Sequence, residues 1–204
     1  MNRVARRRAL QFSVTALTLA MAGCASVPGA PPTGLEHSVT GRFSVSAQVN
    51  GHSDNGAGRF RLTTAGPTLT LDLSTPLGTT LARLERDAQG VRLTAPRDNG
   101  AMTTMQGLDP EALLQEAFGW AIPVDGLADW VAGRPAPASA AQVQRDAAGN
   151  VRTIEQSGWT IEIQERFAGP SGTPRRLLAT RPASGPAPSL SLRLVLDEPG
   201  TSTQ

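Results

Sequence analysis

The sequence predicts a mainly β protein with a few short helices: a strongly curved antiparallel sheet of about nine to eleven strands, whose apolar face is covered by the helices. Three observations lead to this fold class. Apolar and polar residues alternate with a period of two through most of the chain, and short turns rich in Gly, Pro and Asn separate the alternating runs. Only the middle of the chain changes to a helical period, over two stretches long enough to cover a curved sheet and too short to fill a large barrel.

The first strands are expected to form an antiparallel meander with one buried and one solvent-exposed face. Each is a run in which every second residue is apolar, joined to the next run by a turn such as residues 50–56. The alternation changes phase between Leu81 and Leu84, which indicates a β-bulge. The expected strands are 38–49, 57–63, 68–73, 79–86 and 90–95.

Arginines are expected on the exposed face of this meander. Mixed with acidic residues, they keep the face soluble and deter edge-to-edge pairing. The alternative is that they form a contact surface for an acidic carrier protein. The residues concerned are Arg59, Arg61, Arg83, Arg86 and Arg92.

Two helices are expected in the middle of the chain. Asp109 is a favourable N-cap, Pro110 suits the first helical position, and Glu111 adds a second acidic side chain near the positive end of the helix dipole. Gly119 ends this helix. A second short helix is expected at 125–131, followed by Gly and Pro stop signals.

Alternating strands then return and continue almost to the end of the chain. Turns rich in Pro and Gly separate them, and residues 199–204 are expected to be a disordered tail. The expected strands are 141–146, 151–157, 159–167, 175–181 and 189–196.

The first 23 residues are typical of a secretory signal. Four arginines precede an apolar run, 9–22, which is too short to span the hydrocarbon core as a helix. The run is followed by the chain's only cysteine, Cys24, in the sequence Met21-Ala22-Gly23-Cys24. This resembles the lipobox of bacterial lipoproteins, although Met21 stands where Leu is usual. A retained signal anchor, a twin-arginine signal and an unpaired thiol are the alternatives.

The lipobox interpretation divides the chain into four parts. Residues 1–23 are removed, and Cys24 carries S-diacylglycerol and N-palmitoyl groups, which anchor the protein permanently. The Pro- and Gly-rich segment 24–36 is a flexible tether, followed by a folded domain over 37–198 and then the tail. Because Ala25 and not Asp follows the cysteine, the outer membrane is the expected destination, on its periplasmic side.

Composition and motifs argue against several functions. Removal of the four leader arginines leaves 15 arginines against 17 acidic residues, so no basic excess exists to attract nucleic acid or anionic lipid. His37 and His52 lack neighbours at metal-ligand spacing and are expected in solvated loops. The chain has no G-x-S-x-G motif and no P-loop. We therefore expect no enzymatic activity, metal or cofactor.

The turn Pro76-Leu77-Gly78 carries an apolar side chain at an unexpected place. Pro and Gly are ordinary turn residues, but Asn, Asp or Ser is usual between them. An exposed leucine forgoes about 1.5–3 kcal/mol of burial. This favours a functional use of Leu77.

Taken together, these segments make the chain resemble the outer-membrane lipoprotein LolB family over nearly all of its mature length. The most specific motifs are the PLGTT turn and the block IPVDGLADWVAGRP. The sequence departs from the family at Met21, at Pro199, where members often have a tryptophan, and in its Pro-rich final loops. The other similar segments are GRFSVSAQ, GRFRL, LDLSTPLGTTLARLE, SGWTIEIQE and LRLVLDE.

The resemblance implies that the curved sheet is an unclosed antiparallel β-barrel of about nine to eleven strands, with helices covering an apolar cavity. It also implies a function and a role for the turn. A family member takes lipoproteins from the soluble carrier LolA and places their acyl chains in the outer membrane, without ATP, so that transfer runs downhill. The leucine of the matching turn engages the membrane, which implies that role for Leu77 between Pro76 and Gly78. We expect the protein to be a monomer whose partners are LolA, acylated lipoproteins and the outer membrane.

The lining of the expected acyl-chain cavity follows from strand and helix phase alone. A solid core is the alternative for each residue. Two other functions also stay open: a LolA-like or lipocalin-like lipoprotein that binds another lipid, and a structural lipoprotein with a filled core. The expected lining residues are Phe43, Phe60, Leu71, Trp130, Trp159 and Ile161.

Overall fold

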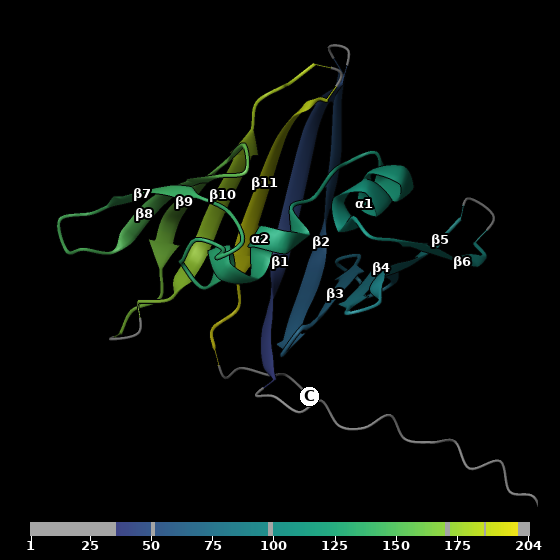
Figure 1. Cartoon of the computed structure of the whole chain (residues 1–204), viewed down its shortest axis with the longest axis horizontal. Coiled ribbons are helices and arrows are strands. Elements are labelled where there is room, and N and C mark those ends of the chain that lie inside the picture. Colours follow the sequence, from purple (N-terminus) through teal and green to yellow (C-terminus); the bar gives the residue numbers. More distant parts are fainter. Residues whose placement is uncertain (1–35, 50–51, 98–99, 170–171, 186, 200–204) are drawn as a thin grey trace, which may run out of the picture. The chain divides into compact units, whose positions relative to one another are not determined.

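One antiparallel sheet of eleven strands contains almost all of the β-structure in the computed structural model (Figure 1). The structure describes residues 36–49, 52–97, 100–169, 172–185 and 187–199. The strands are β1 (His37–Val49), β2 (His52–Ala65), β3 (Thr68–Ser74), β4 (Thr80–Asp87), β5 (Gly90–Pro96), β6 (Met102–Gly107), β7 (Ala141–Arg145), β8 (Val151–Gln156), β9 (Trp159–Arg166), β10 (Pro174–Arg181) and β11 (Ser189–Leu196).

The strand order shows that the sheet is not closed. It runs β6-β5-β4-β3-β2-β1-β11-β10-β9-β8-β7, so β6 and β7 are its two edges. Each strand pairs with its neighbour in sequence within two wings, β1–β6 and β7–β11. The wings join where β1 pairs with β11, for example at Phe43 and Leu194. The expected unclosed antiparallel sheet and its strand number are confirmed.

Two short helices, α1 (Pro110–Phe118) and α2 (Val124–Val131), lie against one face of this sheet (Figure 1). Asp109 caps α1, because its Oδ1 accepts hydrogen bonds from the backbone N–H groups of Glu111 (2.9 Å) and Ala112 (3.3 Å). Gly119 ends α1 in the left-handed conformation, with φ of 78°. Both helices therefore form where the sequence predicts them.

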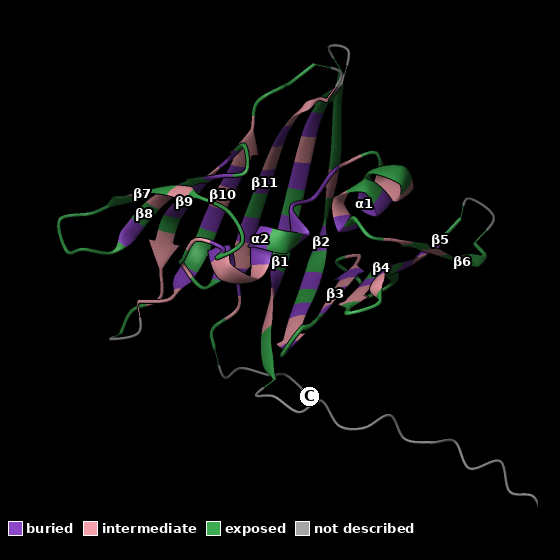
Figure 2. Cartoon of the chain, in the orientation of Figure 1, coloured by how far each residue is buried: buried purple, intermediate pink, exposed green. Residues whose placement is uncertain are grey.

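The core lies between the two helices and the inner face of the sheet. Buried residues alternate with exposed ones along the strands (Figure 2), as the period of two predicts. Two phenylalanines pack on glycines of the neighbouring strand: Phe43 of β1 is opposite Gly58 of β2, and Gly41 is opposite Phe60.

The structure corrects two details of the first wing and confirms a third. Residues 52–56 belong to β2 and do not form a turn, so His52 as well as His37 begins a strand instead of lying in a loop. Strand β6 was not predicted, because only its two methionines are apolar and it forms a sheet edge. The expected bulge is confirmed at Leu81: Leu73 pairs with Ala82 and Ser74 pairs with Thr80, which leaves Leu81 without a partner.

Several sequence-based predictions fall outside the described residues. They are the signal (1–23) with Cys24, the tether (24–36) apart from Glu36, and the tail (199–204) apart from Pro199.

Candidate functional site

The β3–β4 turn holds Leu77 in a defined conformation. The backbone N–H of Gly78 donates to the Thr75 carbonyl (2.9 Å), and that of Thr75 donates to the Thr79 carbonyl (2.8 Å). The Thr75 hydroxyl accepts a further hydrogen bond from the Thr79 N–H (3.1 Å). Gly78 has φ of 92°, which a side chain would strain. The backbone on both sides of Leu77 is therefore fixed by hydrogen bonds and by Pro76.

Leu77 is 96% exposed, and no described apolar side chain covers it. Pro76 and Gly78 are exposed as well. A second leucine, Leu108, is 87% exposed between β6 and α1, beside Gly90. Gly90 begins β5 just after β4 ends, whereas Leu77 precedes β4. The two exposed leucines therefore lie at opposite ends of β4, and only Leu77 was singled out by its turn chemistry.

The six residues expected to line a cavity are all buried and share one core cluster. Phe43, Phe60 and Leu71 come from the first wing, and Trp159 and Ile161 come from β9 in the second. Trp130 covers them from α2, with its ring centroid 6.5 Å from that of Trp159. The structure thus brings side chains from both wings together beneath the helices.

A hollow of about 370 Å³ opens beside this cluster. It lies where the end of α2 meets the start of β1 and the end of β11. Val39, Val131, Phe167 and Leu196 form its apolar walls, and Arg134 is among the polar residues that line it. Val131 and Leu196 belong to the core cluster, but none of the six residues predicted to line a cavity lines this hollow.

Helix α2 is tied to the second wing through Trp130. Its indole Nε1 donates to Gln156 Oε1 (2.9 Å), and Gln156 also donates to the carbonyls of Ala136 (2.7 Å) and Ser139 (2.8 Å). Gln156 is only 3% exposed, and its partners compensate for its burial. The indole also packs against Gly126, where a methyl group would overlap the ring.

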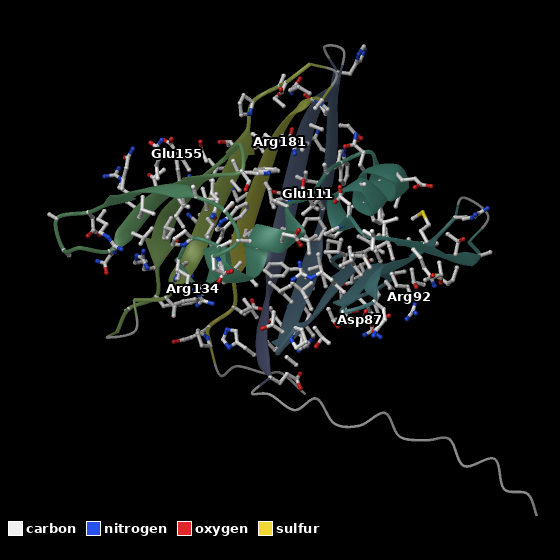
Figure 3. All side chains as sticks on the ribbon, in the orientation of Figure 1. Asp87, Arg92, Glu111, Arg134, Glu155 and Arg181 are labelled. Atoms are coloured by element: carbon white, nitrogen blue, oxygen red, sulfur yellow. The ribbon has the colours of Figure 1, made fainter. Side chains whose placement is uncertain are left out.

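Two ion pairs link the helices to opposite wings. Asp125 of α2 pairs with Arg86 of β4, and Glu111 of α1 lies 3.7 Å from Arg181 of β10 (Figure 3). The Arg181 guanidinium also lies 5.0 Å from the centre of a Trp159 ring. The prediction that Arg86 lies on the exposed face is wrong, because Arg86 is opposite the buried Leu69 and Val91 and turns toward the helices.

Burial raises the pKa of the Glu111 carboxyl from its ordinary 4.5 to about 7. The positive charge of Arg181 opposes this shift, and the negative charges of Asp109 and Asp125 add to it. The folded protein therefore holds this proton more tightly than the unfolded chain does. Near neutral pH, the contact between α1 and β10 includes a partly protonated carboxyl.

We expect Glu111→Gln to flatten the pH dependence of stability between about pH 4.5 and 7. For an acid whose pKa is raised on folding, stability is highest below 4.5 and falls as the pH rises toward 7, and Gln removes this slope. Urea unfolding at pH 5 and pH 8 measures the effect. An unchanged difference between the two pH values in the variant would show that Glu111 is not the group responsible.

No helix within the described residues is long and apolar enough to span a membrane. In the same part of the chain, no group of three or more His, Cys, Asp or Glu side chains could hold a metal ion.

The fold and this site are those of a protein that binds apolar ligands and contacts membranes. An open antiparallel sheet buries aromatic and aliphatic side chains beneath two helices, an apolar hollow reaches the surface beside them, and a rigid turn exposes a leucine. Apolar surfaces of this kind are suited to apolar ligands and membranes.

Comparison with known proteins gives the family. The family model "Outer membrane lipoprotein LolB" matches residues 36–198. Two proteins called outer-membrane lipoprotein LolB are similar along nearly their whole length: one from Cupriavidus pinatubonensis is 35% identical (94% of this chain, 95% of the relative), and one from Ralstonia nicotianae is 36% identical (94% and 97%). A solved structure of a LolA superfamily protein from Nitrosomonas europaea gives a TM-score of 0.44 at 9% identity. The match covers 79% of this chain and 84% of that one. The chain belongs to the outer-membrane lipoprotein LolB family.

Proposed function

We propose a mechanism for this family member in which the Leu77 turn delivers acyl chains to the membrane and the covered inner face of the sheet holds them beforehand. The chain is an outer-membrane lipoprotein, the receptor that accepts lipoproteins from LolA and anchors them in the outer membrane. Its partners are therefore LolA and lipoprotein cargo. We propose that it works as a monomer.

The exposure of Leu77 carries the proposal for delivery. At 96% exposed on a rigid turn, this side chain can enter lipid without any rearrangement of the fold. Burial in hydrocarbon recovers about 1.5–3 kcal/mol, which is far too little to anchor a protein. Leu77 therefore acts as a small wedge that disorders lipid locally, while Pro76 and Gly78 hold it outward.

The buried cluster between the helices and the sheet supports the proposal for holding cargo. Phe43, Phe60, Leu71, Trp130, Trp159 and Ile161 form the apolar floor and cover that an acyl chain would contact. We propose the hollow beside α2, which is lined in part by Val131 and Leu196 of the core cluster, as the place where acyl chains enter. Because no nucleotide motif is present, the inner face must hold acyl chains more favourably than LolA does and less favourably than the bilayer.

Transfer from the carrier tests this function. The soluble domain, starting just after Cys24, is mixed with LolA carrying a labelled lipoprotein, and the label is followed by affinity separation of the two proteins. The domain is expected to take up most of the label. In the control, LolA is mixed with the same lipoprotein without acyl chains, and no label is expected to move to the domain. If cargo stays on LolA, the inner face does not hold acyl chains as proposed.

We propose that Cys24 is the acylated residue and the only membrane anchor. Replacing it with Ser removes the thiol that accepts the diacylglyceryl group, so neither acylation nor processing at this site is expected. The soluble domain exported with a cleavable leader is expected in the soluble periplasmic fraction. Fractionation of cells followed by immunoblotting measures this, and a soluble domain found entirely with membranes would place the anchor elsewhere.

A further inference from the structure

Four exposed arginines form a row on the outer face of the sheet, away from the helices. Arg42 of β1 is directly opposite Arg59 of β2, and Arg61 follows two residues later on β2. On the other side, Arg193 of β11 is opposite Ser44, two residues from Arg42. The row therefore crosses β11, β1 and β2, which lie side by side in Figure 1.

None of these arginines forms an ion pair within the described residues. Asp197 and Glu198 line the same hollow as Arg61, so the end of the row at Arg61 has acidic neighbours, whereas Arg42 and Arg59 have none at their paired positions. Asp72 is opposite Arg61 but is bound by Arg83, at 2.6 Å. Glu162 of β9 is separated from Arg193 by β10. Arg42 and Arg59 are directly opposite each other, and like charges at such positions disfavour strand pairing. A bound anionic partner would relieve this repulsion.

Polar groups that suit a phosphate lie next to the row. A surface hollow of about 380 Å³ is bordered by Ser44, Ser46, Ser191, Asn55 and Arg193. Hydroxyl and amide groups donate hydrogen bonds to phosphate oxygens, and the planar guanidinium group binds two of them at once.

The row leads to the turn that displays Leu77. Arg59 is opposite Ser74, the last residue of β3, and the turn begins at Thr75. We propose that the arginine row binds anionic phospholipid headgroups and so holds the membrane surface beside Leu77. This inference deepens the proposed function and rests on the role given there to Leu77. The proposal departs from the expectation, based on net charge, that anionic lipid is not attracted, because the row concentrates positive charge on one face.

Binding of the soluble domain to vesicles, without cargo or LolA, tests the proposal. Vesicles of phosphatidylcholine alone are compared with vesicles that also contain phosphatidylglycerol, at low and high salt, by co-sedimentation. We expect preferential binding to the anionic vesicles, and high salt should weaken it because it screens exposed charges. Each arginine near the surface is expected to contribute about five-fold, so Arg42→Gln with Arg59→Gln should weaken binding roughly twenty-five-fold.

The matched control is Arg152→Gln, because Arg152 is an exposed arginine on β8 in the other wing. It is expected to bind like the wild-type domain. Equal binding of the double variant and the wild type would overturn the proposal. Transfer of cargo from LolA to the double variant is measured as well. If the variant binds vesicles normally but fails to receive cargo, the row is a protein-docking surface instead. This experiment measures vesicle binding and not delivery of cargo. A failure of the Leu77 mechanism would therefore appear in the delivery experiment with Leu77→Glu and not in this one.

Discussion

Leu77→Glu is expected to leave the fold and the acceptance of cargo from LolA intact, and to slow delivery into membranes by roughly a hundred-fold. The side chain is 96% exposed, so a carboxylate at this position meets only water in the free protein. Moving a carboxylate in place of a leucine into hydrocarbon costs about 3 kcal/mol, and each 1.4 kcal/mol is about ten-fold. The measurement follows labelled lipoprotein from LolA, through the soluble domain, into vesicles.

Leu108 provides the matched control for this experiment. It is 87% exposed but lies at the other end of β4, so Leu108→Glu adds the same charge away from the proposed contact. We expect Leu108→Glu to deliver cargo at the wild-type rate and Leu77→Phe to retain much of the activity. Delivery by Leu77→Glu at the wild-type rate would mean that Leu77 is merely an exposed leucine.

Gly58→Ala is expected to destabilise the domain by about 3 kcal/mol, a large part of the ~5–15 kcal/mol typical of a folded domain. The added methyl group would overlap the carbonyl oxygen of Ser74 and lie 2.9 Å from the Phe43 ring. Because the oxygen belongs to the backbone of β3, the neighbouring strand must move. Urea unfolding measures the change as a lower midpoint at constant slope.

The control for this variant is Gly107→Ala in β6. A methyl group there would lie 3.5 Å from the nearest atom, in the side chain of Leu113, which is an ordinary contact. We expect its unfolding midpoint to stay close to that of the wild type. Shortening the aromatic ring with Phe43→Leu is not expected to rescue Gly58→Ala, since the backbone clash remains. Full stability of Gly58→Ala would contradict the close approach of β2 and β3.

The fold was predictable because the alternation is regular and the turns are strongly marked. Leucines and valines at every second position fix which face of each strand is buried, and the cap at Asp109 fixes the start of α1. Strand β6 escaped prediction because an edge strand with little buried surface needs few apolar residues. Arg86 was misplaced because its residue type suggested solvent, although its position two residues after the buried Leu84 indicated the inner face.

The site was predictable only where it depends on local sequence. Leu77 stands out in the sequence because Pro and Gly flank it. Leu108 is also highly exposed, but it precedes an N-cap, a position where an apolar residue usually packs against its helix. The pairs Glu111–Arg181 and Trp130–Gln156 connect residues far apart in sequence. Such contacts depend on how the helices lie across the two wings, and no local pattern encodes that.

The contact between residue 77 and lipid is the central claim, and an environment-sensitive fluorophore tests it most directly. The soluble domain lacks Cys24, so Leu77→Cys places its only thiol at the turn for labelling, and Ala148→Cys, in the exposed turn between β7 and β8, serves as the control. On addition of anionic vesicles, the label at 77 is expected to shift its emission to the blue, and lipid-attached quenchers should reduce it, while the label at 148 changes in neither respect. Vesicle binding without a blue shift or quenching at residue 77 would contradict the proposed mechanism.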